Sequence, residues 1–108
     1  MKTLKFRSFL IPKILSGEKN STWRLFDDKN LLKGDEIQLV EWGTDRVFGV
    51  AGVINVTEKP LGKINASDMK GHEGFASKKK MYEAYKRYYQ KDVGPDTLVK
   101  IVKFELKK

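Results

Sequence analysis

The stretch GEKNSTWR, residues 17–24, follows a short apolar run and places a cationic side chain on each side of a hydroxyl group. Its leading glycine is a natural helix end, so we expect a helix to end there and the chain to continue in an extended form. Side chains alternate along a strand, so Thr22 and Arg24 would point to one side and Trp23 to the other. The stretch therefore predicts a site in which Lys19, Thr22 and Arg24 hold a polar ligand. The alternative is a solvated loop, because these residue types are common on surfaces.

Length and composition limit the chemistry that is available. A chain of 108 residues can bury one modest core, so we expect a single domain over residues 1–108. With no cysteine and one histidine, His72, thiol nucleophiles, disulfides and Cys/His zinc sites are excluded. No cofactor and no metal is implied, although a carboxylate-bound magnesium stays open. The sequence has neither a signal-peptide pattern nor an apolar run of membrane-spanning length, which predicts a cytoplasmic protein without a membrane partner.

The charge of the chain favours a polyanionic partner. Lysine and arginine number 22 against 14 acidic residues, giving a net charge of +8. RNA or a nucleoside-like ligand fits this charge best. Solubility alone or attraction to an anionic membrane surface would also explain it.

The periodicity of the first half predicts a strand, a helix and a sheet. Residues 4–6 form a short strand, and Ser8 caps a helix that tolerates Pro12 only in its first turn. A Lys-Gly-Asp turn at 33–35 leads into a strand over 36–42, and a hairpin connection at 43–46 leads into a strand over 47–56. Two glycines in this last strand suggest the bend of a barrel.

The second half adds two helices and a final strand. Residues 65–71 make one or two helical turns, 72–75 form a tight connection, and 97–106 form a strand with apolar residues on both faces. The predicted fold class is α+β, a small and mostly antiparallel β-barrel with packed helices.

Residues 77–89 have the pattern of an amphipathic helix. Apolar residues recur at helical spacing, and we interpret this stripe as core packing rather than as a stacking surface for bases. The remaining surface is cationic and is predicted to contact nucleic-acid phosphates, unless it is only a solvated face. Its members are Lys78, Lys79, Lys80, Lys86 and Arg87.

Three short motifs resemble one known family. They are Gly-x-Lys-x-x-Thr-x-Arg at 17–24, the Lys-Gly-Asp turn at 33–35, and Glu-Gly-Phe at 73–75 before a long helix. In this order and spacing they resemble the activating signal cointegrator homology (ASCH) family of PUA-like β-barrels. The resemblance covers nearly the whole chain. It implies a barrel with a cleft lined by a lysine and a threonine, in a superfamily associated with RNA binding and RNA modification.

One bacterial branch of small ASCH proteins removes the acetyl group from N(4)-acetylcytidine, giving cytidine and acetate. The catalytic Lys, Thr and Glu of that branch fall on Lys19, Thr22 and Glu73 here. Amide hydrolysis without a metal or a cysteine needs a nucleophile and a base, and our hypothesis is that Thr22 is the nucleophile and that Lys19 takes its proton once burial or Arg24 lowers the pKa of the lysine. Glu73 would then orient Lys19 or move a proton to the departing cytosine amine. The chain departs from the branch in its Gly-Phe after the glutamate and in its longer, lysine-rich helix, so the substrate stays open.

Non-catalytic alternatives remain open from the sequence. If a carboxylate keeps Lys19 charged, Thr22 and Arg24 would hydrogen-bond a base edge or a phosphate, and the domain would be an RNA-binding module. Arg24 could instead pair with Asp27 or Asp28. A third possibility is an adaptor for an acidic protein.

The aromatic residues of the sequence are also open to more than one interpretation. Trp23 and Trp42 could stack on bases, although the alternation along the strand favours packing for Trp23. His72 is either a proton carrier or an ordinary surface residue.

Overall fold

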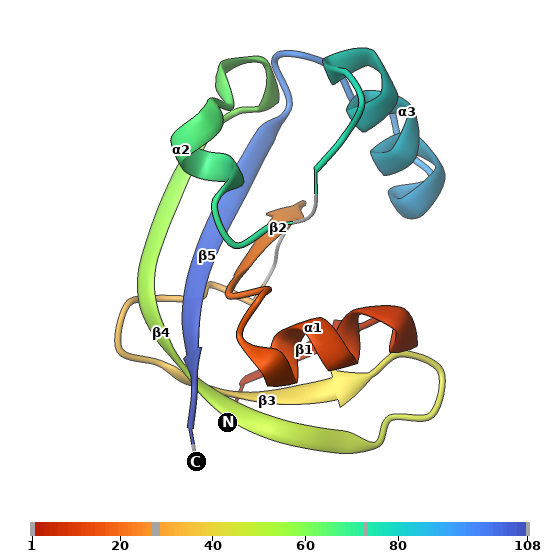
Figure 1. Cartoon of the computed structure of the whole chain (residues 1–108). Coiled ribbons are helices and arrows are strands. Elements are labelled where there is room, and N and C mark those ends of the chain that lie inside the picture. The colour runs from red at the N-terminus through yellow and green to blue at the C-terminus, as the bar shows by residue number, and fades with distance from the viewer. Residues whose placement is uncertain (1, 27–28, 73, 108) are drawn as a thin grey trace.

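A curled five-stranded sheet forms the centre of the computed structural model, which describes residues 2–26, 29–72 and 74–107 (Figure 1). The strand order is β1-β3-β4-β5-β2. β1 and β3 run parallel, and the other neighbouring pairs are antiparallel. The α+β class and the mostly antiparallel sheet are therefore confirmed. Because β1 and β2 are the two edges, the sheet is a half-barrel. The strands are β1 (Lys2–Phe6), β2 (Ser21–Leu25), β3 (Glu36–Glu41), β4 (Val47–Pro60) and β5 (Leu98–Leu106).

The chain turns from β1 into a short helical segment that leads to β2. This segment is a 3-10 helix, η1 (Ser8–Leu10), followed by α1 (Ile11–Ser16), with a proline in the first turn of α1. Gly17 ends α1 with φ of 87°, as its position predicts. The predicted cap at Ser8 is wrong, because the helical backbone already begins at Ser8 and no side chain caps either helix.

β4 is longer than predicted and strongly curved (Figure 1). It continues to Pro60 because its second half stays paired with β5, where Pro60 lies opposite Leu98. The register shifts between Leu39 and Val40 of β3, and again between Val53 and Asn55 of β4. Such irregularities bend a strand, so the bend predicted from the glycines is present.

The interior is divided into two apolar clusters, one on each side of β2. The first includes Leu4, Phe6 and Ile14 and lies where α1 covers the sheet. The second includes Trp23, Leu25 and Met81 and lies where α3 (Lys78–Tyr89) covers it. Figure 1 shows β2 in the space between α1 and α3. The fold therefore brings residues 21–25 between two separately packed halves.

A small capped helix positions the connection between β4 and α3. After η2 (Leu61–Lys63), Asn65 caps α2 (Ala66–Met69), and the Asp68 carboxylate accepts the Asn65 backbone N–H at 3.0 Å. The same carboxylate accepts a hydrogen bond from Lys59 Nζ at 2.8 Å. This arrangement ties α2 to the end of β4 and fixes where the following residues 70–72 begin.

We predict that Asp68 makes the stability of the fold depend on pH. Burial acts to raise the pKa of its carboxyl, but the bonds from Lys59 and Asn65 outweigh burial and hold the pKa below its ordinary value. A lowered pKa in the folded state stabilises above the ordinary pKa, near 4, and this contribution is lost as the pH falls. Asp68→Asn should lower the free energy of unfolding by about 1 kcal/mol at pH 7, and the difference from wild type should shrink in acid.

Urea unfolding between about pH 3 and pH 7 measures this difference. Asp96→Asn is the matched control, because Asp96 is an exposed aspartate outside any helix or strand. A difference for Asp68→Asn that stays constant over the whole pH range would contradict the prediction.

Candidate functional site

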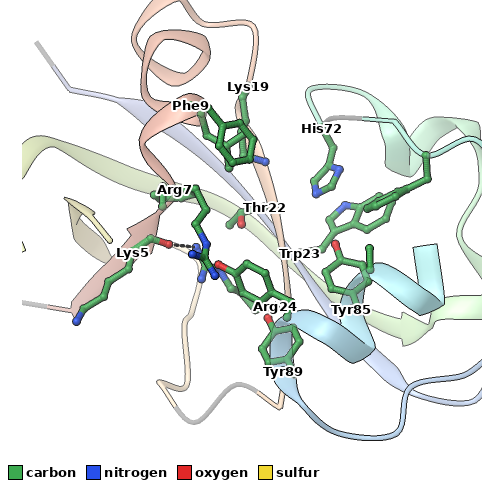
Figure 2. A pocket seen from close by; sticks show the side chains of 15 residues that line it. Lys5, Arg7, Phe9, Lys19, Thr22, Trp23, Arg24, His72, Tyr85 and Tyr89 are labelled. Carbon is green, nitrogen blue, oxygen red and sulfur yellow. Dashed lines mark hydrogen bonds between the residues drawn. The ribbon is translucent and has the colours of Figure 1, made fainter. Parts of the chain in front are cut away.

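A cavity of about 240 Å³ opens beside β2, and we call it the cleft (Figure 2). Its walls come from four segments: the end of β1 with η1, the stretch from Lys19 to Arg24, the connection that contains His72, and α3. The lining is mostly aromatic and apolar. A few polar groups lie among these rings.

Lys19 and Thr22, two of the residues predicted to form a site, both line the cleft. Lys19 is only 3% exposed, and its Nζ donates to the backbone carbonyl of Ser21 at 2.8 Å. Thr22 is 5% exposed. Glu73, the third predicted catalytic residue, lies outside the described residues. The structure thus brings a buried lysine and a threonine hydroxyl into one cavity.

Arg24 lines the same cleft and connects the two edges of the half-barrel. Its Nη2 donates to the backbone carbonyl of Lys5 on β1 at 3.0 Å, and its guanidinium lies 5.0 Å from the ring centre of Phe6. Asp27 and Asp28, the alternative partners considered above, lie outside the described residues. Arg24 therefore braces β2 against β1 and still presents part of its guanidinium to the cleft.

Trp23 both packs in the core and lines the cleft. It is 3% exposed and its ring stacks on His72, with ring centres 3.9 Å apart and planes 13° from parallel. The packing role was predicted. Trp23 nevertheless lines the cleft, because the cleft extends past the edge of β2 to His72 and Phe75, so residues from both faces of the strand reach it. His72 is accordingly part of the cleft.

Unsatisfied polar atoms gather on this strand. Within residues 2–26, 29–72 and 74–107, the buried side-chain atoms without a hydrogen-bond partner are Ser21 Oγ, Trp23 Nε1 and Arg24 Nε. All three belong to β2, and Trp23 and Arg24 line the cleft. A buried donor left unpaired costs about 1–3 kcal/mol. Such groups are rare in folded proteins except where a ligand or a function requires them.

α3 contributes tyrosines that the sequence interpretation assigned to the core. Met81 is buried as expected, but Tyr85 and Tyr88 of the predicted stripe line the cleft, and so does Tyr89, which lies outside that stripe. The Tyr89 hydroxyl also accepts the backbone N–H of Leu25 at 3.2 Å. The signal was present in the residue type, because tyrosine, unlike leucine, carries a polar tip that is usually placed where one end is apolar and the other polar.

The basic residues of α3 do not line the cleft. Their side chains are exposed on the helix, and Lys78 Nζ donates to the backbone carbonyl of Gly62. Arg7 and Phe9 do line the cleft, although no pattern in the sequence predicted them as site residues. Both follow β1 directly, in a segment whose course toward α3 no local pattern shows.

A pair of backbone hydrogen bonds holds His72 beside Trp23. The carbonyl of Gly71 accepts from the backbone N–H groups of Asn20 at 3.0 Å and Ser21 at 3.1 Å. Gly71 has φ of 74°, a conformation that glycine adopts without strain. This contact joins the segment after α2 to the start of β2.

Over the described ranges, no group of three or more histidine, cysteine, aspartate or glutamate side chains is placed to hold a metal ion. In the same ranges, no helix has both the length and the apolar character that crossing a membrane requires.

Comparison with known proteins gives the fold. No family model and no curated protein matched the sequence. The ASCH domain from Lactobacillus crispatus JV V101 aligns over 97% of this chain and 79% of its own, with 15% identity and a TM-score of 0.69. ASCH from Zymomonas mobilis aligns over 95% and 65%, with 12% identity and a TM-score of 0.68.

The chain has the ASCH fold. Protein EF3133 from Enterococcus faecalis V583, assigned to DUF984, is also similar, with 21% identity over 91% of this chain and 69% of that one, and a TM-score of 0.73. These identities are low, so they establish the architecture and not the activity. The ASCH resemblance seen in the three motifs is thus confirmed at the level of the fold.

We predict that Gly71→Ala destabilises the protein more than Gly17→Ala does. Both glycines have positive φ, so alanine costs about 1 kcal/mol at either position. A Cβ at Gly17 meets nothing within 4 Å, whereas a Cβ at Gly71 would lie 1.8 Å from Asn20 Oδ1, so the Asn20 side chain must move. Urea unfolding measures the two losses, and near-ultraviolet circular dichroism reports the environment of Trp23. Equal losses and unchanged spectra would show that Gly71 does not constrain the contact with β2.

Proposed function

We propose that the cleft binds a nucleoside or a single base of RNA, and that the chain hydrolyses the acetyl amide of N(4)-acetylcytidine to cytidine and acetate. The observation that carries this proposal is the burial of Lys19 and Thr22 in a cavity walled by aromatic rings. The ASCH fold supports it, because the motif resemblance places the catalytic lysine and threonine of one ASCH branch on these two residues.

The size and lining of the cleft suit one base. Pockets for drug-sized ligands have volumes of roughly 300–1,000 Å³. A cavity of about 240 Å³ is smaller and favours a single planar group. Bases stack readily on aromatic side chains, and Trp23 and Tyr85 stand on one side of the cleft, as Figure 2 shows. The Thr22 hydroxyl and the Arg24 guanidinium, which both line the cleft, would meet the polar edge of such a ligand.

Hydrolysis would proceed in two balanced steps. The Thr22 hydroxyl attacks the acetyl carbonyl, Lys19 takes the hydroxyl proton, and the amide C–N bond breaks as that proton passes to the departing cytosine amine. Water then cleaves the acetyl ester of Thr22 and releases acetate. The Arg24 guanidinium, which lines the cleft, is a candidate to stabilise the oxyanion.

We predict that Thr22→Val lowers the rate of cytidine formation from N(4)-acetylcytidine by a factor of at least about 10³, while the fold is retained. Valine keeps the branched shape of threonine and removes only the hydroxyl. Thr22→Ser, which keeps a hydroxyl, is the matched control and should retain measurable turnover. Chromatographic separation of cytidine after incubation is the assay, with circular dichroism as the test of folding. Turnover by Thr22→Val at the wild-type rate would exclude Thr22 as the nucleophile.

A second candidate function is a non-catalytic RNA-binding module. It is favoured by the exposed cations of α3, the helix that also forms one wall of the cleft. Lys78 is partly committed to the Gly62 carbonyl, so Lys79, Lys80, Lys86 and Arg87 are the main candidates for phosphate contact. In this case the cleft would hold a base and the helix would follow the backbone.

We predict for this module that RNA affinity falls steeply with salt, whereas turnover of a neutral nucleoside barely changes. Each phosphate contact to a single strand contributes about 0.7 to the slope of log K against log salt concentration. Substituting Lys79, Lys80 and Lys86 together by glutamine should reduce this slope by about 2. Lys13→Gln with Lys33→Gln, two exposed lysines outside α3, is the control pair. Equal slopes for the α3 variant and wild type would remove α3 as the phosphate surface.

A further inference from the structure

Arg7 joins the mouth of the cleft to a tryptophan outside it. Its guanidinium carbon lies 3.9 Å from the ring centre of Trp42 and 5.0 Å from the ring centre of Tyr88. Arg7 and Tyr88 line the cleft, whereas Trp42 does not and is the first residue after β3. Because one guanidinium contacts both rings, Trp42 must lie directly beside the cleft opening.

The aromatic rings at this opening are exposed. Trp42 is 51% exposed, Tyr88 is 45% exposed and Phe9 is 70% exposed. They come from three separate parts of the chain: the β3–β4 turn, α3 and η1. Large aromatic side chains that only pack a core would be covered. A rim of exposed rings around a cavity is instead typical of an interaction surface.

Arg7 is a fixed cation without an acidic partner among the residues that the structure describes. The carboxylates of the neighbouring hairpin are already paired: Asp45 accepts from Lys5 at 3.0 Å, and Glu41 lies 3.7 Å from Arg46. No described carboxylate lies within 4.0 Å of the Arg7 guanidinium, and no described atom accepts its N–H groups. Its planar fork of donors is therefore available to an anion, and this geometry matches a phosphate group in a bidentate contact.

We propose that Trp42 and Arg7 form a second subsite, which holds the nucleotide next to the base in the cleft. The neighbouring base would stack on Trp42, and the phosphate that joins the two nucleotides would bind Arg7. The ligand is then a single-stranded RNA rather than a free nucleoside. This proposal rests on the proposed function of the cleft. Arg7 covers one face of Trp42, so the base would stack on the other face while the guanidinium meets the phosphate. An acidic peptide would supply carboxylates for Arg7 but no base for Trp42.

The first experiment compares ligands on the wild-type protein by isothermal titration calorimetry. The probes are cytidine, the dinucleotides CpU and UpC, and poly-glutamate as an acidic peptide without bases. We expect the dinucleotide of the correct polarity to bind about tenfold more tightly than cytidine, as stacking of one base predicts. Poly-glutamate should bind no more tightly than cytidine.

Two variants with matched controls locate the subsite. Trp42→Ala should remove the tenfold gain of the dinucleotide and leave the affinity for cytidine unchanged. Leu98→Ala, at a residue 53% exposed on β5, is its control and should keep the gain. Arg7→Gln should weaken the dinucleotide and reduce its salt slope, whereas Arg46→Gln, an arginine already facing a carboxylate, should not.

The possible results distinguish a failure of the second subsite from a failure of the function proposed for the cleft. If cytidine binds and neither dinucleotide binds more tightly, the second subsite is overturned while the cleft remains a base-binding site. If poly-glutamate binds as tightly as the better dinucleotide, the surface recognises acidic chains and the subsite is likewise overturned. If none of the nucleosides or dinucleotides binds, the proposed function fails and the subsite fails with it.

Discussion

The antiparallel pairing of β2 with β5 is the constraint on which the rest of the structure depends. It places Thr22 opposite Val102 and Trp23 opposite Ile101, so residues from the start of the chain lie against its last strand. Without this pairing, α1 and α3 would pack on one sheet with nothing between them. With it, a short edge strand separates two apolar clusters, and its polar residues line a cleft between them.

An edge strand also explains why the site has few satisfied polar groups. A central strand has neighbours on both sides, whereas β2 has β5 on one side and a free edge on the other. The Gly71 carbonyl and the Tyr89 hydroxyl provide part of the missing pairing, because they accept the backbone N–H groups of Ser21 and Leu25. Ser21 Oγ and Trp23 Nε1 stay unpaired in the described part of the chain, at a cost in stability.

Local signals predicted most of the fold and part of the site. Gly17 and the alternation after it predicted that Lys19 and Thr22 lie together, and both line the cleft, because helix ends and strand faces are decided within a few residues. Trp23 shows the limit of that reasoning. Its burial followed from the alternation, but its place in the cleft depends on His72, which reaches it only through the Gly71 contact. Arg7 was missed for the same reason, since its partners are far along the chain.

The tyrosines of α3 also show what local sequence patterns cannot predict. Helical spacing cannot distinguish a residue that fills a core from one that walls a cavity, because both face inward. Met81 lies deep in the second cluster, while Tyr88, seven positions later, contacts Arg7 at the opening. The difference arises because the first half of the chain, through η1, approaches only one end of α3. Arg7, which follows β1 directly, is the residue through which this segment meets α3 at the opening of the cleft.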